Sequence, residues 1–345
     1  MAVAVVLFHC GVGWSYNVAV SGVTFFFLSS TFLLAMRHPF ERIEPRSCAR
    51  FVIDHALRLY PLHWLGLALL IAINLAFHAK PIDWPATGLS ALLLHSWSPV
   101  HDVHYGINPV AWYMCALLFC YAIYPWMAHV LGRCRLCAKV LLAVLLAVLL
   151  AVVLQPLNIP QREAIFVNPL SHVLDMIVGL TLFHLYCLAQ RSNMDVASHA
   201  TAIEWCALLL LAAVIAVNVA TTWIRPWEDD IIWLLPQGAM LLALALTAGR
   251  EGALGRLLLC GPLQWVGSIS FEMFVLQFVA FHFFNFFIAP VAGHYGWDIY
   301  DKLAWFALPL LLLFSWGVNR WFTRPVGKLI KTKLYKLLPE NDQDH

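Results

Sequence analysis

Residues 138–155 read AKVLLAVLLAVLLAVVLQ, and this stretch decides the class of protein to which the chain belongs. It carries one charged side chain, Lys139, next to its start and is otherwise almost wholly apolar. An α-helix rises about 1.5 Å per residue, so roughly 20 apolar residues cross the hydrocarbon core of a bilayer. The stretch therefore predicts a membrane-spanning helix.

The same pattern of long apolar stretches recurs along the chain. Eight further segments share it: 19–36, 62–79, 109–131, 170–189, 201–223, 230–249, 264–289 and 303–322. A shorter stretch, MAVAVVLFHCGV at residues 1–12, would span only about 18 Å as a helix. We expect it to be the outer part of a first helix whose beginning lies outside this chain. The sequence thus predicts an all-α protein, a polytopic transmembrane helix bundle of about ten helices with an incomplete first helix.

The composition of the 345 residues excludes the other classes. Hydrophobic residues make up 62% of the chain and charged residues 12%, against about 45–50% and about 25% in soluble globular domains. So few charges cannot cover a soluble surface, and the long apolar segments exclude a disordered chain, a coiled coil and a membrane barrel. The net charge of +2 gives no reason to expect a nucleic-acid partner.

Basic residues are distributed unevenly between the two sets of alternating loops. The loops 37–58, 132–139, 190–200 and 250–256, with the tail from residue 320, hold 17 Lys and Arg residues, whereas the opposite loops hold four. Loops rich in Lys and Arg stay in the cytoplasm. We therefore expect a cytoplasmic C-terminus, and an even number of crossings places the start of the first helix there as well.

Two regions follow from this layout, a transmembrane domain at residues 1–323 and a basic cytoplasmic tail at 324–345. The tail begins RPVGKLIKTKLYK, which interleaves basic and apolar residues. We expect it to lie on the inner membrane surface against anionic lipid. Among nine cysteines, Cys134 and Cys137 form a lone Cys-x-x-Cys without a second ligand pair nearby. No metal site and no permanently bound cofactor is therefore expected.

Ionisable side chains inside apolar segments are costly and are candidates for function. His9 lies in the first apolar stretch, Asp175 follows His172 by three residues, and Glu272 lies in GSISFEMFVLQF. Each also has a structural interpretation. A histidine can form an interhelical hydrogen bond, Asp175 can pair with a neighbouring cation, and Glu272 can lie at the level of the membrane interface.

The stretch before the apolar segment 62–79 holds three basic residues that are candidates for binding a ligand. RFVIDHALRLYPLHW at residues 50–64 holds Arg50, His55 and Arg58. Arg50 and Arg58 are eight residues apart, so a helix places them about two turns apart on one face. Guanidinium groups bind phosphate through two parallel hydrogen bonds, which suits a phosphorylated ligand at the cytoplasmic mouth of the bundle. The alternative is that these residues only grip lipid headgroups.

Five stretches follow one another along the chain: GVTFFFLSSTFLLA at 22–35, RFVIDHALRLYPLHW at 50–64, HSWSP and NPVAWYMCALLFCYAIYP within 95–125, SHVLDMIVG at 171–179 and LQWVGSISFEMFVLQF at 263–278. In this order they resemble the motif blocks of membrane acyltransferase family 3. Members of that family are polytopic enzymes that O-acylate cell-surface carbohydrates. The resemblance implies a divergent membrane O-acyltransferase that lacks the start of its first helix.

The sequence departs from the pattern of that family at several motif positions. Thr24 stands for an Asp, Thr31 for a Gly, His55 for an Arg, Leu117 for a Glu, His172 for an Arg, Asp175 for a Glu and Gln277 for a His. An Arg that precedes the family's first-helix His, here His9, would fall before Met1. These changes affect the catalytic positions more than the scaffold.

The resemblance also implies roles for the candidate residues. A family member takes an acyl group, here expected to be acetyl, from cytoplasmic acyl-CoA and delivers it to a glycan hydroxyl. His9 would remove the hydroxyl proton, because histidine titrates near neutral pH. Asp175 or Glu272 would orient its ring. The other implied contacts are with acyl-CoA, through Arg58, Arg50 and His55, and with the acceptor, through Asn108 and Trp112.

The expected partners are acyl-CoA as donor substrate, a carbohydrate or glycolipid acceptor and the lipid bilayer. The expected location is a bacterial inner membrane, with both termini in the cytoplasm. Two other function classes remain as alternatives, a non-catalytic membrane protein on the same scaffold and a transporter of glycans or lipid-linked sugars. Against the transporter, the two halves of the sequence lack paired Gly- or Pro-broken helices.

Overall fold

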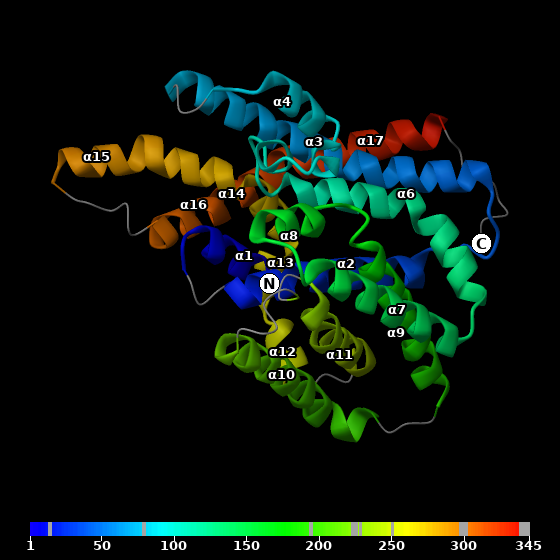
Figure 1. Ribbon diagram of the computed structural model, residues 1–345. Helices are drawn as coiled ribbons and strands as arrows, with labels where there is room; N and C mark the ends of the chain where they lie inside the picture. The colour runs from blue at the N-terminus through cyan, green and yellow to red at the C-terminus, as the bar shows by residue number, and fades with distance from the viewer. Residues whose placement is uncertain are drawn as a thin grey trace.

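The computed structural model describes residues 1–12, 16–77, 81–192, 196–221, 227, 230–249, 252–296 and 303–337. All regular structure within these ranges is helical (Figure 1). The long helices are α2 (Tyr16–Arg37), α3 (Pro45–Phe77), α6 (Ala111–Arg133), α7 (Leu136–Leu154), α9 (Val173–Arg191), α10 (Val196–Ala220), α11 (Ile231–Thr247), α14 (Ser270–Phe283), α16 (Leu303–Val318) and α17 (Arg324–Leu337).

Shorter helices connect the long ones or extend them. They are α1 (Ala2–His9), α4 (Trp84–Ala91), η2 (His95–Trp97), α5 (His101–His104), α8 (Ile159–Phe166), α12 (Ala253–Leu258), α13 (Gly261–Ser268), η4 (Phe284–Ile288), α15 (Ala289–His294) and η6 (Asn319–Thr323). The π-helical turns η4 and η6 join α14 to α15 and α16 to α17 without a break. Each of these two pairs therefore forms one continuous rod.

The predicted helix bundle is confirmed. Eight described helices are long and apolar enough to cross a membrane, and the 17-residue α11 is a shorter apolar helix. Together with α1 they account for all ten predicted segments. One boundary differs, because α3 begins at Pro45 rather than near residue 62. The basic stretch before Pro61 continues the helix beyond the apolar segment, since charged side chains are tolerated in a helix outside the hydrocarbon.

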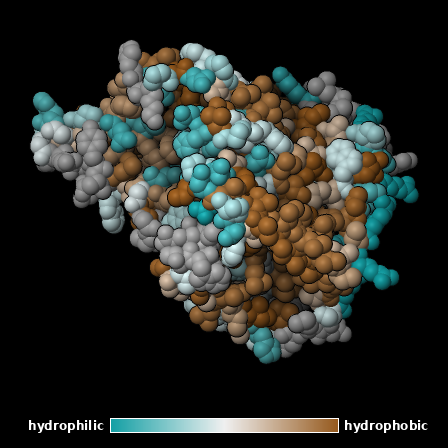
Figure 2. All heavy atoms as spheres, viewed as in Figure 1, coloured by the Kyte–Doolittle hydropathy of each residue, from teal (hydrophilic) through white to brown (hydrophobic). Residues whose placement is uncertain are grey.

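The outer surface of the bundle is apolar, as expected for an integral membrane protein. Only 6% of the most apolar window of α7 is buried, and its Val and Leu side chains face outward. Figure 2, drawn from the same direction as Figure 1, shows a broad apolar surface. A surface of this kind requires lipid around it, because water does not solvate it favourably.

The centre of the bundle is α2, which packs against α1, α9 and α11 (Figure 1). Gly179 of α9 lies where that helix comes closest to α2. A Cβ atom at this position would lie 2.8 Å from Cβ of Thr31 and 3.0 Å from the carbonyl oxygen of Leu28. Only glycine permits this approach, which brings the beginning of α9 beside the middle of α2. Helix α14 in turn packs against α1, α3 and α16.

One buried carboxylate has a purely structural set of contacts. Glu204 of α10 is fully buried and accepts a hydrogen bond from Thr247 Oγ1 at 3.0 Å. It also accepts from the backbone N–H groups of Gly252, Leu254 and Gly255 at 3.1, 2.9 and 3.2 Å. These bonds satisfy the first N–H groups of α12, which have no partner within their own helix. Glu204 therefore joins α10, α11 and α12.

Candidate functional site

A cavity of about 370 Å³ lies between the N-terminal helices and α14. Two histidines line it among mostly aromatic and aliphatic side chains. The full lining is Val5, Phe8, His9, Ala19, Val20, Val23, His101, Tyr105, Pro109, Val110, Trp112, Phe166, Phe274 and Phe278. An apolar cavity with a few polar groups is the usual form of a small-molecule site.

The hydrogen bonds of His9 determine which ring nitrogen carries the proton. His9 Nδ1 lies 2.9 Å from Oε1 of Gln277. The amide of Gln277 is oriented by its own Nε2, which donates to the carbonyl oxygen of Phe274 at 2.8 Å. Oε1 is therefore the acceptor and Nδ1–H the donor. The lone pair of His9 then lies on Nε2, the nitrogen that can act as a base.

The group that orients His9 corrects one expectation from the sequence. Asp175 or Glu272 was expected to hold the imidazole ring, but His9 Nδ1–H donates its hydrogen bond to the amide oxygen of Gln277. Glu272 instead accepts from Nδ2 of Asn319 at 2.7 Å. Asp175 is bonded to His172. Glu272 bonds elsewhere because α14 presents Gln277, not Glu272, to the end of α1, and Asp175 lies in the first turn of α9 beside His172.

The two residues expected on the acceptor side have different surroundings. Trp112 lines the cavity together with His9. Asn108 does not belong to the lining, and its Nδ2 donates to the carbonyl oxygen of Val275 at 3.2 Å. This bond ties the start of α6 to α14. The structure thus brings Trp112 into the His9 cavity and gives Asn108 a packing contact.

The three residues of α3 that were expected to contact acyl-CoA, Arg50, His55 and Arg58, also differ in their surroundings. Arg58 is half exposed and forms an ion pair with Asp54, one turn before it. His55 is buried, and its Nδ1 donates to the carbonyl oxygen of Phe51 at 2.8 Å. Arg50 lies two turns before Arg58 on the same helix. His55 therefore belongs to the helix packing, while Arg58 faces outward.

Arg58 borders a second, smaller cavity. It has a volume of about 100 Å³ and lies between α3 and the end of the α16–α17 rod. Its lining is Asp54, Leu57, Arg58, Pro61, Leu62, Thr323, Val326, Gly327 and Ile330. The basic amphipathic helix α17 thus packs beside Arg58 on α3, and the side chain of Arg58 stays half exposed.

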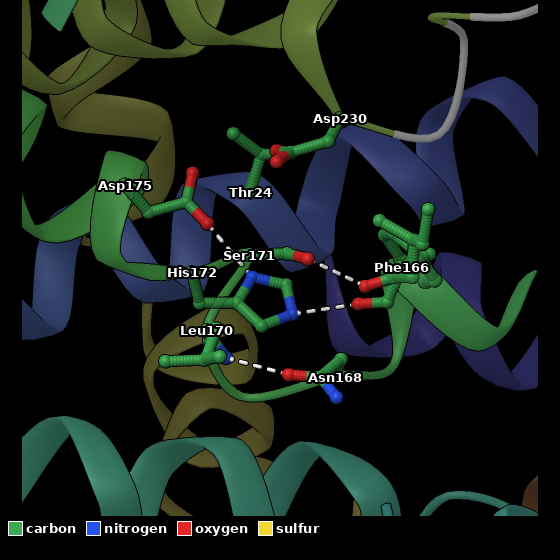
Figure 3. A network of polar contacts seen from close by, with 9 residues as sticks. Thr24, Phe166, Asn168, Leu170, Ser171, His172, Asp175 and Asp230 are labelled. Atoms are coloured by element: carbon green, nitrogen blue, oxygen red, sulfur yellow. Dashed lines mark hydrogen bonds and ion pairs between the residues drawn. The ribbon is translucent and has the colours of Figure 1, made fainter. Parts of the chain in front are cut away.

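A polar cluster lies where α2, α9 and α11 meet, and Figure 3 shows its members. His172, Asp175 and Asp230 each offer one ligand atom, and these three atoms lie within 4.8 Å of one another. Thr24 Oγ1 donates to Oδ1 of Asp230 at 3.4 Å. Sequence reasoning singled out His172 and Asp175 but missed Asp230, which immediately precedes α11.

The loops that connect α3 and α6 contain a buried histidine whose protonation the fold opposes. His95 is fully buried, and both of its ring nitrogens lack a hydrogen-bond partner in the described part of the chain. Burial, with smaller contributions from the neighbouring His63 and His104, lowers the pKa of His95 from its ordinary value of 6.5 to about 3. The unfolded chain thus binds a proton below pH 6.5 that the folded chain does not.

This difference predicts acid sensitivity. His95 does not change the free energy of unfolding above pH 6.5. As the pH drops from 6.5 toward 3, His95 lowers the free energy of unfolding by about 1.4 kcal/mol per pH unit. At pH 5 the loss from His95 is therefore about 2 kcal/mol. We expect His95→Phe to reduce the drop in melting temperature between pH 7.5 and pH 5 in detergent. An equal drop in both proteins would contradict the assignment.

Comparison with protein-family models finds a match to the model described as "Acyltransferase domain", and it covers residues 1–324. Comparisons with curated proteins and with solved structures find no match. The matched range includes the whole lining of the His9 cavity and the polar cluster, whereas Val326, Gly327 and Ile330 of the smaller cavity lie beyond it.

Proposed function

The chain belongs to the acyltransferase family whose domain model spans residues 1–324, and on this premise we propose that it is a membrane O-acyltransferase acting on carbohydrate. The donor is cytoplasmic acyl-CoA, with acetyl as the expected acyl group. The acceptor is a hydroxyl of a surface polysaccharide, lipopolysaccharide or other glycan. The observation that carries the proposal is His9, with its basic Nε2, in an aromatic cavity of about 370 Å³.

The chemistry requires a base, because a carbohydrate hydroxyl is a poor nucleophile at neutral pH. His9 Nε2 takes the hydroxyl proton while the oxygen attacks the thioester carbonyl carbon. The tetrahedral intermediate collapses with cleavage of the C–S bond, and the imidazolium returns the proton to the departing CoA sulfur. Gln277 holds the Nδ1–H throughout, so the ring keeps one orientation for both proton transfers.

The acceptor side of the cavity fits a sugar ring. Trp112, Tyr105 and Phe166 contribute aromatic rings to the lining. Such rings pack against the C–H faces of sugars and leave the hydroxyl groups free for other contacts. His101, which also lines the cavity, is an exposed hydrogen-bonding group at its edge. We infer that the sugar enters between these rings and presents one hydroxyl to His9.

We assign the binding of the acyl-CoA donor to Arg58 and to the smaller cavity between α3 and α17. A guanidinium that is half exposed can exchange its partner Asp54 for a phosphate of CoA. Arg50, on the same face of α3, extends this cationic surface. The excess of basic residues in these loops supports a cytoplasmic position for this end of the bundle and for both termini. A bacterial inner membrane fits this arrangement.

The Arg58 assignment predicts a specific kinetic change. Arg58→Ala should raise KM for acyl-CoA about 10- to 100-fold at little-changed kcat, since a charge-assisted contact is worth about 1.5–3 kcal/mol. Asp54→Asn should lower that KM, because it removes the competing anion. Arg133→Ala, at the exposed end of α6, serves as the matched control. Equal KM values for Arg58→Ala and Arg133→Ala would refute the assignment.

The proposed activity is tested with the purified full chain, acetyl-CoA labelled in the acetyl group and glycan acceptors. Label on the acceptor, together with release of free CoA, supports the enzyme. Binding of CoA without transfer to any acceptor would support a non-catalytic scaffold protein instead. Movement of glycan across reconstituted vesicles without acylation would support a transporter. The last two outcomes would each overturn the proposal.

A further inference from the structure

The polar cluster between α2, α9 and α11 combines donor atoms of unlike type in the interior of the bundle. His172, Asp175 and Asp230 are 1%, 0% and 5% exposed. His172 Nδ1 and Asp175 Oδ2 are 2.8 Å apart. Figure 3 shows the two carboxyl groups and the imidazole around Thr24. His172 and Asp175 belong to the start of α9 and Asp230 to the start of α11, so the cluster forms only when these two helix ends come together.

Two neighbouring carboxylates in a buried position need compensation. Removing an ionised carboxylate from water costs several kcal/mol, and a second like charge beside it adds to that cost. The other carboxylate oxygen of Asp175, Oδ1, is buried and meets no N–H or O–H donor among the described residues, while the carboxyl group of Asp230 lies within hydrogen-bonding reach of Asp175. Two carboxyl groups in this position need a proton or a cation between them.

The hydrogen bond from Nε2 of His172 turns the other ring nitrogen, Nδ1, toward the carboxyl group of Asp175. Its Nε2 lies 2.9 Å from the carbonyl oxygen of Phe166, which can only accept, so Nε2 carries the proton. Nδ1 in the neutral ring then presents a lone pair toward the carboxylates. This arrangement, with one ring nitrogen donating to a backbone carbonyl, is the usual one for a histidine that ligates a metal through its other nitrogen.

We propose that His172 Nδ1, Asp175 and Asp230 bind one divalent transition-metal cation. A +2 ion balances the two carboxylates, and one imidazole with two carboxylates is a donor set suited to Zn²⁺ or Mn²⁺. Metal–ligand bonds of about 2.0–2.2 Å put adjacent donor atoms roughly 3–3.5 Å apart. His172 Nδ1 and Asp175 Oδ2 are 2.8 Å apart, and all three candidate ligand atoms lie within 4.8 Å of one another. The expected spacing falls between these two distances.

The ion would fix the wall of the cavity without touching its contents. His172 stacks on Phe27 with ring centroids 4.0 Å apart and lies 5.8 Å from the ring of Trp112. Trp112 and Phe166 both line the cavity, and the Phe166 ring centroid lies 6.0 Å from that of His172. Thr24 supports Asp230 from α2. A bound cation therefore joins the starts of α9 and α11, with α2 connected through Thr24, beside the aromatic wall of the cavity.

The test measures metal directly and does not depend on acyl transfer. The purified full chain is stripped with a chelator, incubated with Zn²⁺, freed of unbound ion and analysed for metal per chain. We expect one Zn²⁺ per chain and a higher melting temperature. Asp230→Asn removes an anionic ligand and should weaken binding more than about 100-fold, since even outer-sphere partners of metal ligands are worth about 10- to 100-fold. His172→Gln should do the same.

Glu204→Gln is the matched control, because Glu204 is an equally buried carboxylate outside the cluster. It should retain the ion. Loading the unaltered chain with Co²⁺ in place of Zn²⁺ adds a spectroscopic measurement. Co²⁺ in a buried N/O site of low coordination number absorbs strongly in the visible range, whereas Co²⁺ at surface sites gives weak bands. No uptake of Zn²⁺ by the stripped chain, weak Co²⁺ bands, or equal uptake by Asp230→Asn would overturn the proposal and leave protons as the compensating charges.

Discussion

His9→Ala is expected to abolish acyl transfer, with kcat reduced about 10²- to 10⁴-fold, the range of a general base. The affinity for acyl-CoA should stay unchanged, because the donor phosphates are assigned to Arg58 on another helix. The reduction follows from the geometry of the cavity, where Nε2 of His9 is the basic nitrogen and Gln277 holds the opposite one. Initial rates with labelled acetyl-CoA at saturating acceptor measure the effect.

The control for this variant is another histidine in a membrane helix. His282 lies on α14 outside the cavity, and its Nδ1 donates to the carbonyl oxygen of Phe278 at 2.9 Å. His282→Ala should keep most of the activity and the same protein level in the membrane. Full transfer by His9→Ala would show that the base is a different group. Loss of protein from the membrane would be detected by immunoblot and would separate misfolding from loss of chemistry.

Hydropathy was sufficient to predict the bundle, because the length and polarity of a membrane helix are properties of a single segment. It also identified His9, since an ionisable residue in an apolar segment is unusual wherever the helix packs. The position of α8 was open to prediction as well. Asn158 and Gln161 form a capping box with Pro160 in the first turn, and this sequence signal marks the helix that ends at Phe166.

The partners of these residues could not be predicted in the same way. Gln277 and Asp230 lie 268 and 206 residues from the side chains they contact, His9 and Thr24. Their pairing depends on which face each helix presents, and an apolar helix without an aqueous side has no strong pattern that shows its inward face. A carboxylate was expected beside His9 for chemical reasons. The register of α14 places an amide there instead.

Gln277→Leu is expected to reduce kcat about 10- to 100-fold, the effect of losing one buried hydrogen bond of about 1–3 kcal/mol. KM for both substrates should change little, because Gln277 does not line the cavity. Leucine fills a similar volume, so the loss comes from the ring of His9, which no longer has an acceptor for Nδ1–H and samples other orientations. The split between kcat and KM separates this role from a general loss of structure.

Gln277→Glu provides the opposite change at the same atom. A carboxylate accepts the Nδ1–H bond more strongly than an amide and stabilises the imidazolium form of His9. The ring then stays protonated to higher pH, so the acid limb of the pH–rate profile for kcat should move upward relative to the unaltered chain. A purely structural role for Gln277 would leave that limb in place while lowering activity at every pH. The direction of the shift therefore decides whether Gln277 acts through His9.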